Sequence, residues 1–267
     1  YRFAQYTCSV AHFVRLALGL GGPTAVVSTA CSSSAKVFAM AQRMLLLGVI
    51  DAAIVGGVDS LCLTTLYGFH SLQLLSQNPC MPYDTNREGI SIGEAAVFAL
   101  LTRDGSYMPS GSLLIKGVGE SSDAYHMSSP HPEGLGARQA MQSALQQARL
   151  SAPEIDYIHL HGTATKNNDA IESIAVSAVF EEKPPASSTK GATGHCLGAA
   201  GALNVAIGAL ALQQQVAWGS PGTEELDATL SPIHYQVHNV ARPVNHVLSN
   251  SFGFGGSNCS IVLGLKD

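Results

Sequence analysis

The stretch Ser28-Thr29-Ala30-Cys31-Ser32-Ser33-Ser34 places one cysteine between two patterns of secondary structure. Before it, Thr24–Ser28 is a short β-branched run that predicts a strand. After it, Ser32–Gly48 is rich in Ala, Met and Leu and predicts a helix. Cys31 would therefore lie on a sharp turn at a helix N-terminus. Such a cysteine is either a nucleophile or a small buried side chain in a helix cap.

The helix N-terminus gives the nucleophilic interpretation of Cys31 a physical basis. Unpaired backbone N–H groups and the helix dipole favour an anion there. The dipole stabilises the thiolate by about 0.3–1 kcal/mol, and by up to about 2 kcal/mol, which lowers a thiol pKa by about one unit. We therefore expect a useful fraction of thiolate at Cys31 without an adjacent base.

Outward from this turn, the chain shows the same order of elements twice. In the first half, the predicted helix is Ser32–Gly48 and the glycine loop is Arg87–Gly93. The predicted strands are Thr24–Ser28, Asp51–Val55 closed by Gly56-Gly57, and Ala95–Thr102. In the second half, the predicted strands are Ser112–Gly119, Ile155–Leu160 and Cys259–Leu265. The predicted helices are Gly136–Ala148 and Gly194–Gln214, and the glycine loop is Ser251–Gly256. Alternating strands and helices predict a duplicated, layered α/β fold.

The predicted boundary between the halves is the Gly-, Pro- and Ser-rich segment 105–111, which is too short for a free linker. We expect residues 1–104 to form an N-terminal half that carries the nucleophile. Residues 105–267 form the second half. Two mixed sheets should enclose the buried helices Ser32–Gly48 and Gly194–Gln214 in an α-β-α-β-α order of layers.

Composition narrows the classes of partner. Apolar residues make up 46% of the chain and charged residues 12%, about half the usual charged share. This favours extensive burial and a subunit interface. With a net charge of −5 and no basic run, nucleic acid is not an expected partner. The most apolar window, Gly198–Leu212, is shorter than a membrane span and contains Asn204.

The cysteines indicate a reducing compartment. Six are scattered without a C-x-x-C pair, at Cys8, Cys31, Cys62, Cys80, Cys196 and Cys259. In a chain of this size that pattern predicts free thiols and a cytoplasmic protein rather than a disulfide framework. The first residue, Tyr1, opens neither a signal peptide nor an initiating Met, and we expect this sequence to begin inside a longer protein.

Histidines and a lysine follow in the second half. His161 lies at the carboxyl end of a predicted strand, where α/β proteins place active sites, whereas His159 lies inside that strand and is interpreted as structural. Lys190 and His195 occur in a Gly- and Thr-rich loop that opens the predicted helix Gly194–Gln214. Lys190 is costly to bury unless it is paired; its alternative is a solvated loop lysine.

Four motifs in this order resemble the β-ketoacyl synthase family of the thiolase-like fold. They are T-A-C-S-S-S around Cys31, H-G-T-A-T from His161, K-G-A-T-G-H-x-x-G-A-A-G from Lys190, and S-F-G-F-G-G-S-N from Ser251. Family members carry a substantial segment before the cysteine turn, and only thirty residues precede it here. The resemblance therefore implies a thiolase-like fold whose N-terminal half is incomplete in this sequence.

The resemblance also implies roles for individual residues. Cys31 would take an acyl group from a carrier-protein thioester, His161 and His195 would assist decarboxylation of a malonyl thioester, and Lys190 would support them electrostatically. The backbone N–H groups of Cys31 and Phe254 would form the oxyanion hole. The remaining substrate-binding residues implied are Thr163, Thr165, Phe252, Gly253 and Phe254, with the two phenylalanines as a mobile gate.

This set of residues agrees with the chemistry of a decarboxylative Claisen condensation. The reaction passes through an enolate and a tetrahedral oxyanion, which both need preorganised hydrogen-bond donors. Two histidines can supply those donors without a Ser–His–Asp relay. The implied enzyme is an elongating acyltransferase of fatty-acid or related polyketide or polyene synthesis. It needs no cofactor or metal, and its expected partners are an acyl carrier protein and a second subunit, identical or related.

One polar position departs from the family pattern, and several charged residues are interpreted as structural. Elongating synthases commonly carry glutamate where this chain has Asn204, which keeps hydrogen bonding but not charge. Asp169 and Glu172 are expected to cap the helix Asp169–Phe180. A structural ion-pair set is expected at Asp84, Arg87 and Glu94.

Three other functions remain open at this point. A thiolase would use a second cysteine near the last glycine loop, for which Cys259 is the candidate. A non-catalytic chain-length-factor-like subunit would lack the nucleophile. A cysteine hydrolase would use Cys31 and His161 and leave Lys190 unexplained. We also expect a dimer interface that includes the strand Thr24–Ser28.

Overall fold

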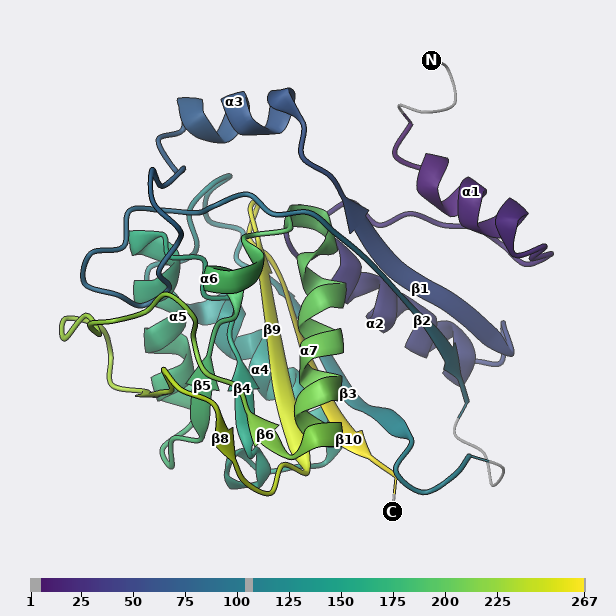
Figure 1. Ribbon diagram of the computed structural model, residues 1–267. Helices are drawn as coiled ribbons and strands as arrows, with labels where there is room; N and C mark the ends of the chain where they lie inside the picture. The colour runs from purple at the N-terminus through teal and green to yellow at the C-terminus, as the bar shows by residue number, and fades with distance from the viewer. Residues whose placement is uncertain (1–5, 104–107, 267) are drawn as a thin grey trace.

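The computed structural model describes residues 6–103 and 108–266. Two sheets of different size dominate it (Figure 1). Part of the predicted boundary at 105–111 lies outside the described residues. The N-terminal elements are α1 (Ser9–Ala17), α2 (Ser33–Leu46), β1 (Ala52–Asp59), α3 (Leu63–Ser71) and β2 (Ala95–Thr102).

The remaining elements form the larger part of the molecule. Its helices are α4 (Leu135–Ala148), α5 (Lys166–Val179), α6 (Lys190–Thr193) and α7 (Ala200–Gln214). Its strands are β3 (Leu113–Ser122), β4 (Tyr157–His159), β5 (Pro185–Ser187), β6 (Val216–Ala217), β7 (His234–Tyr235), β8 (Val240–Ala241), β9 (His246–Gly253) and β10 (Ser257–Leu265).

The large sheet is mixed, with strand order β3-β10-β9-β4-β5-β7. Strand β10 pairs antiparallel with β3 and β9, whereas β4 runs parallel to β9 and β5, and β5 runs parallel to β7. The small sheet is the antiparallel pair β1–β2, and β6 pairs with β8 at the periphery. The predicted mixed α/β fold is confirmed.

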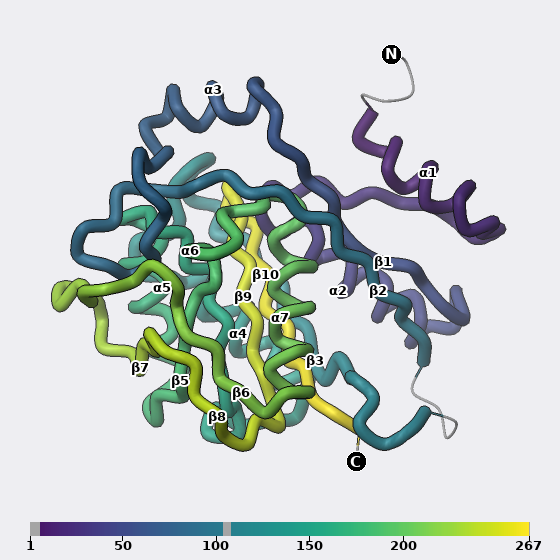
Figure 2. Tube along the Cα trace, viewed as in Figure 1, coloured from purple at the N-terminus to yellow at the C-terminus, as the bar shows by residue number. Residues whose placement is uncertain are grey.

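Helix α7 lies between the two sheets and defines the core (Figures 1 and 2). It packs against β9 and β10 on one side and against β1, β2 and α2 on the other, while α4 covers the far face of the large sheet and packs on α5. A helix packed between two sheets is expected to be largely apolar, as Ala200–Gln214 is apart from Asn204 and the exposed Gln213 and Gln214. The described layers are therefore helix, sheet, helix and sheet.

Within the described residues, one helical segment, Leu197–Gln214, has the length and apolar composition that a membrane span requires. In this fold, 56% of that segment is buried inside the protein. It contains α7, and core helices of soluble proteins pass the same test. The segment is therefore explained by its place between the two sheets.

Two expectations about the first half are wrong. Thr24–Ser28 is not a strand; among the described residues no strand lies beside it to complete a hydrogen-bonded ladder. Gly56-Gly57 does not end β1, which continues to Asp59. A side chain at Gly56 would lie 2.1 Å from the Val97 carbonyl oxygen, so the glycine permits close pairing with β2 rather than a turn.

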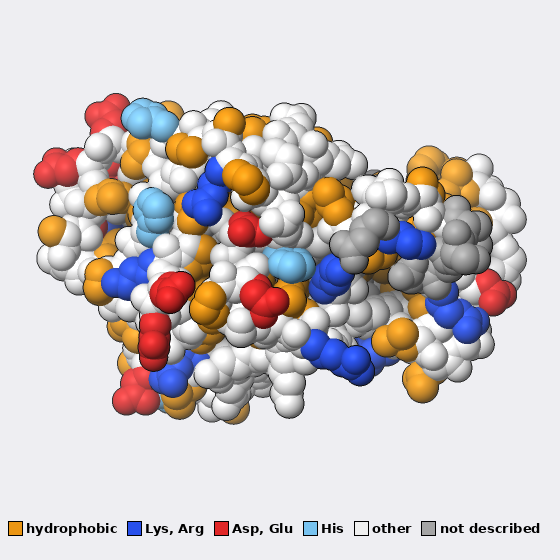
Figure 3. Space-filling view, turned by 90° about the horizontal axis from the view of Figure 1, so that it is seen from below, with side chains coloured by type: hydrophobic (Ala, Val, Ile, Leu, Met, Phe, Trp, Pro, Cys, Tyr) orange, Lys and Arg blue, Asp and Glu red, His pale blue; other side chains and the backbone are white. Residues whose placement is uncertain are grey.

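The surface reflects the low share of charged residues. On the face shown in Figure 3, acidic and basic side chains lie among one another, separated by neutral surface and apolar side chains. All six cysteines are free thiols, as the sequence predicts.

Candidate active site

Cys31 lies on a strained turn just before helix α2. Ala30 has a φ of 52°, in the left-handed region that non-glycine residues rarely adopt. The Ser33 hydroxyl donates to the Ala30 carbonyl at 2.6 Å, and the Thr29 N–H donates back to the Ser33 hydroxyl at 2.9 Å. The serines after the cysteine therefore hold the turn, and the predicted placement of Cys31 is confirmed.

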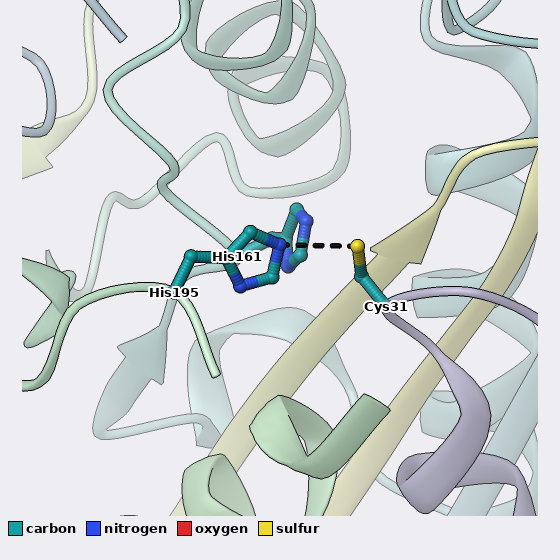
Figure 4. A group of neighbouring side chains, drawn as sticks. All are labelled: Cys31, His161 and His195. Atoms are coloured by element: carbon teal, nitrogen blue, oxygen red, sulfur yellow. Dashed lines mark hydrogen bonds between the residues drawn. The ribbon is translucent and has the colours of Figure 1, made fainter. Parts of the chain in front are cut away.

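The thiol faces two histidines at the closed end of a cavity. Its sulfur lies 3.0 Å from His195 Nε2, and the rings of His195 and His161 are 5.4 Å apart at 82° (Figure 4). All three residues are buried. A thiol from the first half of the chain thus meets imidazoles that follow 130 and 164 positions later.

The electrostatics at Cys31 differ from the expectation. Burial raises the pKa of the thiol to about 11, against the opposing effects of the Lys190 ammonium and the backbone N–H groups of Phe254 and Cys31. The helix N-terminus alone therefore does not produce a resting thiolate, because desolvation outweighs it. A proton acceptor is needed, and His195 Nε2 is within hydrogen-bonding distance. The backbone N–H groups of Cys31 and Phe254, the pair expected to form the oxyanion hole, interact with the sulfur and oppose the rise of its pKa.

His161 follows strand β4 and is held through its backbone. Its N–H donates to the Glu172 carboxylate at 2.8 Å, and the N–H of Gly162 donates to the other carboxylate oxygen at 2.7 Å. The carbonyl oxygen of His161 accepts a hydrogen bond from the Lys190 ammonium. Burial, with Lys190 nearby, holds the pKa of both His161 and His195 well below the usual range, so both rings are neutral.

Lys190 lies behind the histidines rather than in the cavity. It is 2% exposed and begins the short helix α6, so the solvated-lysine alternative is wrong. Burial lowers the pKa of Lys190, and the negative charge of Glu172 opposes that shift. His159, interpreted as structural, is fully buried with Nε2 at 3.1 Å from the Thr189 hydroxyl.

The expected substrate-binding residues all line one cavity of about 380 Å³. Thr163 and Thr165 form one wall, with their hydroxyl oxygens 2.9 Å apart. Phe252 packs on His161 with ring centroids 5.8 Å apart. Phe254 lies in the turn between β9 and β10, 6.1 Å from the Phe69 ring. Cys31, His161 and His195 line the same cavity, so it leads to the reactive atoms.

The sequence interpretation of the acidic residues after His161 is wrong in part. Thr165, not Asp169, is the N-cap of α5 and accepts from the Asn168 N–H. Asp169 instead accepts from the backbone N–H groups of Thr163 and Tyr83. Glu172 holds the loop that carries His161. The Asp169 and Glu172 carboxylates thus accept from backbone N–H groups of loops outside α5.

The structural set expected at Asp84, Arg87 and Glu94 is connected in part: Arg87 Nη1 donates to the Asp84 carbonyl oxygen at 2.7 Å, whereas the ion pairs of Arg87 involve other residues. Arg87 pairs with Asp227 at 2.6 Å and lies 3.7 Å from Asp169. Glu94 accepts from the Leu61 N–H at 2.7 Å.

Other lining residues were missed by sequence reasoning. They come from segments without a catalytic motif, namely Phe69, Gln73, Asp123, Ser128 and Lys166–Asn168. Among these residues, Asp123 could have been recognised as a site residue from the sequence, since it follows the predicted strand Ser112–Gly119 in a short polar run. It accepts from Asn258 Nδ2 at 2.8 Å and from the His131 N–H at 3.0 Å.

Comparison with known proteins agrees with this geometry. The family model of the β-ketoacyl synthase N-terminal domain matches residues 3–105, and that of the β-ketoacyl synthase C-terminal domain matches residues 113–223. The chain belongs to the β-ketoacyl synthase family. The two matched regions contain Cys31 in the first case and His161, Lys190 and His195 in the second.

Individual members of the family are similar over nearly the whole chain. It is 39% identical to 3-oxoacyl-[acyl-carrier-protein] synthase 2 of Rhizobium meliloti, over 91% of this chain and 61% of that protein. It is 34% identical to the mitochondrial 3-oxoacyl-[acyl-carrier-protein] synthase of Arabidopsis thaliana, over 93% of this chain and 58% of that protein. The chain thus spans about three fifths of the length of these β-ketoacyl synthases.

Solved structures show the same fold. A ketosynthase of Xenorhabdus doucetiae, in complex with its chain length factor, superimposes with a TM-score of 0.94 and 43% identity, over 99% of this chain and 66% of that one. A β-ketoacyl synthase of Burkholderia phymatum gives a TM-score of 0.91 and 29% identity, over 97% and 65%. These ketosynthase structures confirm the predicted thiolase-like fold. Among the described residues, however, the α-β-α-β-α order lacks one outer layer, and the small sheet is an antiparallel pair rather than a mixed sheet.

The geometry also bears on the thiolase alternative. Cys259 is fully buried in strand β10 within the apolar core and does not line the cavity. A second reactive cysteine of the thiolase kind is therefore not provided by Cys259.

Proposed function

We propose that this β-ketoacyl synthase condenses an acyl group on Cys31 with a malonyl group on an acyl carrier protein. The single observation that carries the proposal is the thiol of Cys31 at 3.0 Å from His195 Nε2, with His161 beside it at the end of a cavity. The products are a 3-ketoacyl carrier protein and carbon dioxide. The pathway is fatty-acid synthesis or a related polyketide or polyene pathway.

The first half-reaction moves the acyl group to the enzyme. The Cys31 thiol transfers its proton to His195, and the sulfur attacks the carbonyl carbon of the acyl thioester. The oxyanion that forms accepts hydrogen bonds from the N–H groups of Cys31 and Phe254, which point at the sulfur. The carbon–sulfur bond to the carrier breaks, and the carrier thiol leaves with the proton from His195.

The second half-reaction forms the new carbon–carbon bond. Donors from His161 and His195 to the malonyl thioester oxygen stabilise the enolate left when carbon dioxide departs. The enolate carbon attacks the acyl carbon on Cys31, and the Cys31 sulfur is the leaving group. Because Lys190 binds the His161 carbonyl and Glu172 binds the His161 N–H, both act as positioning residues rather than as groups in contact with substrate.

The cavity walls are proposed to bind the substrate arm. Thr163 and Thr165 offer hydroxyl groups to the polar part of the carrier arm, and Phe252, Gly253 and Phe254 border the acyl group. A side chain at Gly253 would lie 2.6 Å from the Thr29 carbonyl oxygen, so the turn can approach Cys31 only with glycine there. Phe254, in the turn itself, is proposed as the gate.

The partners are proposed from the same reasoning. The substrates arrive on an acyl carrier protein, and the active protein is a dimer with an identical or related subunit. Relatives similar to this chain were solved as ketosynthase with chain length factor. The 12% share of charged residues supports an additional interface. The six free thiols fit a cytoplasmic location, where such groups stay reduced.

The proposal is tested by trapping the acyl-enzyme. Protein mixed with an isotopically labelled acyl carrier thioester should gain one acyl mass, and peptide mapping should place it on Cys31. Adding malonyl carrier should release that mass as 3-ketoacyl carrier. The Cys31→Ala protein should gain no label, and Cys62→Ser, which removes an exposed thiol, should behave as the wild type. Label on another cysteine, or release of the acyl group only to water, would contradict the proposal.

A further inference from the structure

The three reactive side chains also make a set of metal ligands. The ligand atoms of Cys31, His161 and His195 all lie within 4.8 Å of one another, and all three residues are buried. Figure 4 shows both imidazole rings converging on the sulfur from the same side. One thiolate and two imidazoles with an open fourth position are a donor set that Zn²⁺ binds in proteins. The condensation has no use for a metal, so this arrangement has a second consequence.

We propose that Cys31, His161 and His195 bind one Zn²⁺ ion, and that the bound ion reversibly blocks acylation of Cys31. The binding is independent of the enzyme's activity. The blocking rests on the proposed function, since it requires Cys31 to be the acyl acceptor.

The geometry is close to what the ion needs. Zn–S bonds of about 2.3 Å and Zn–N bonds of about 2.0–2.1 Å place tetrahedral ligand atoms about 3.3–3.6 Å apart. Here His195 Nε2 and the Cys31 sulfur are 3.0 Å apart, and no pair in the set exceeds 4.8 Å. Shifts of about 1.5 Å or less are therefore enough, and rotation about side-chain torsions supplies them without movement of the backbone.

The protons released on metal binding can be accounted for. Each imidazole donates the lone pair of a ring nitrogen that carries no proton. The thiol releases its proton to water as the sulfur–zinc bond forms, and one metal-bound water leaves for each protein ligand. The N–H groups of Cys31 and Phe254 that point at the sulfur stabilise the resulting thiolate. No oxidant or reductant is involved.

Two features make the site exchangeable rather than permanent. Within the described part of the chain, Nδ1 of His161 and Nδ1 of His195 are buried without a hydrogen-bond partner. Ligating histidines usually donate that N–H to a carboxylate or carbonyl, and loss of such a contact weakens binding about 10–100-fold. The nearby Lys190 ammonium also repels a cation. Zinc should therefore inhibit at this site and be removable by a chelator.

Metal and acyl group must use the same route. The cavity of about 380 Å³ that leads to Cys31 is bordered by Thr163 and Phe254, which are also proposed to border the substrate. Coordination occupies the sulfur lone pair that would attack the thioester. An acyl group on the sulfur in turn removes the thiolate that the ion requires. The two states of Cys31 therefore exclude each other.

Binding is tested with Co²⁺, because Zn²⁺ is d¹⁰ and has no visible spectrum. Tag-free protein in a buffer without thiols should take one equivalent of Co²⁺. A thiolate-to-cobalt charge-transfer band should appear and be abolished by one equivalent of Zn²⁺. Cys31→Ser should remove the band, and His161→Ala and His195→Ala should each weaken binding at least about tenfold. Cys62→Ser is the matched control, since it removes an exposed thiol far along the chain and should leave the band unchanged.

A second measurement keeps the test independent of variant folding. Alkylating Cys31 in the folded wild-type protein, verified by peptide mapping, should abolish the cobalt band. A band that survives this alkylation, or that depends on Cys62 instead, would overturn the site.

Blocking is tested by acylation with and without Zn²⁺. Saturating Zn²⁺ should reduce the acyl mass gained at Cys31 at least tenfold, and EDTA should restore it. Full acylation in the presence of saturating Zn²⁺ would overturn the blocking. A protein that binds Co²⁺ through Cys31 but is never acylated after EDTA treatment would leave the metal site standing and refute the proposed function instead.

Discussion

Strands β2 and β10 both contain apolar runs but have very different surroundings. Strand β10 is flanked by β3 and β9 and covered by α4 and α7, and its interior residues are all buried. Among the described residues, β2 pairs with β1 alone and packs on α7 with one face, and Phe98 and Leu100 on its outer face are 46% and 65% exposed. An apolar run therefore predicts a strand, whereas burial depends on how many neighbours the rest of the fold provides.

The two parts also differ in what they give to the active site. The part around β1–β2 contributes Cys31, the proposed nucleophile, just before α2. The part around the large sheet contributes His161, Lys190 and His195, together with the Glu172 carboxylate, which accepts from the His161 N–H. Both parts meet through the packing of α2 on α7. The proposed nucleophile and the groups proposed to stabilise charge therefore come from different parts of the fold.

The sharpest way to separate these contributions is to measure the partial reactions. Cys31→Ala should reduce acyl transfer and condensation to background but leave malonyl decarboxylation, because His161 and His195 remain. Cys31→Gln should preserve or raise decarboxylation, since its amide imitates the bound thioester. His161→Ala should still be acylated at Cys31 and lose about 10²–10⁴-fold in decarboxylation. Release of labelled carbon dioxide and intact-protein mass check both halves. Loss of decarboxylation in both alanine variants would contradict this division.

The second prediction compares two leucines in corresponding strands. Leu263 in β10 is completely buried, and Leu100 in β2 is 65% exposed. Leu263→Ala should lower the free energy of unfolding of this chain by about 2–5 kcal/mol, because it removes apolar contacts and leaves a cavity. Leu100→Ala should change it by about 0.5 kcal/mol or less. Urea unfolding of both variants checks the difference, and equal losses would show that β2 is as well covered as β10.

A third prediction concerns the buried carboxyl of Glu172. Burial raises the pKa of Glu172 to about 6, above its usual value of about 4.5, so the folded state favours the protonated form. As pH rises from about 4.5 to about 6, the unfolded chain ionises first and the free energy of unfolding falls. The difference of about 1.5 pKa units corresponds to about 2 kcal/mol.

The comparison for this prediction is Glu172→Gln, which has no ionisable group at this position. Its stability should lack the fall between pH 4.5 and 6 that the wild type shows, whatever its stability at one pH. Denaturant unfolding at several pH values measures the two curves. Parallel curves would show that Glu172 has an ordinary pKa in the folded protein.

The smallest effect is expected at a glycine in the less covered part. Gly68 lies inside helix α3 with nothing within 4 Å of an added methyl group. Gly68→Ala should stabilise the chain by about 0.5–1 kcal/mol through helix propensity and loss of unfolded-state freedom. Gly19 has equal space but a φ of 63°, so Gly19→Ala should destabilise by about 1 kcal/mol. Thermal unfolding checks the signs, and two stabilising alanines would refute the backbone argument.

Sequence patterns predicted several long elements well, but they placed the start of the helix Gly194–Gln214 six residues before α7 begins. Ser32–Gly48 and Gly136–Ala148 correspond to α2 and α4, and Ala95–Thr102 is β2. Such elements are specified by local periodicity and by residues within one or two turns. The positions of Cys31 and His161 were predictable because they lie just before α2 and just after β4, whereas His195 lies between α6 and α7.

What the sequence did not predict depends on distant groups. Thr24–Ser28 has a strand composition but no ladder beside it, and the first part of β9 was not predicted, although it lies between β10 and β4. The pKa of Cys31 and the contacts of Glu172 follow from burial and from N–H donors far along the chain. Local sequence patterns carry no information about these surroundings. The pKa of Cys31 and the contacts of Glu172 were therefore predicted wrongly.

The parallel pairing of β4 with β5 and β9 has a kinetic consequence. Strand β9 begins 87 residues after β4 ends, so this pairing closes a long loop before it gains any contact energy. The same register brings the loop of His161 beside the turn after β9. Folding of such non-local pairings is slow compared with helix formation. During refolding, helical circular dichroism should therefore return first, and the reactivity of Cys31 toward acyl thioesters should return only with the completed sheet.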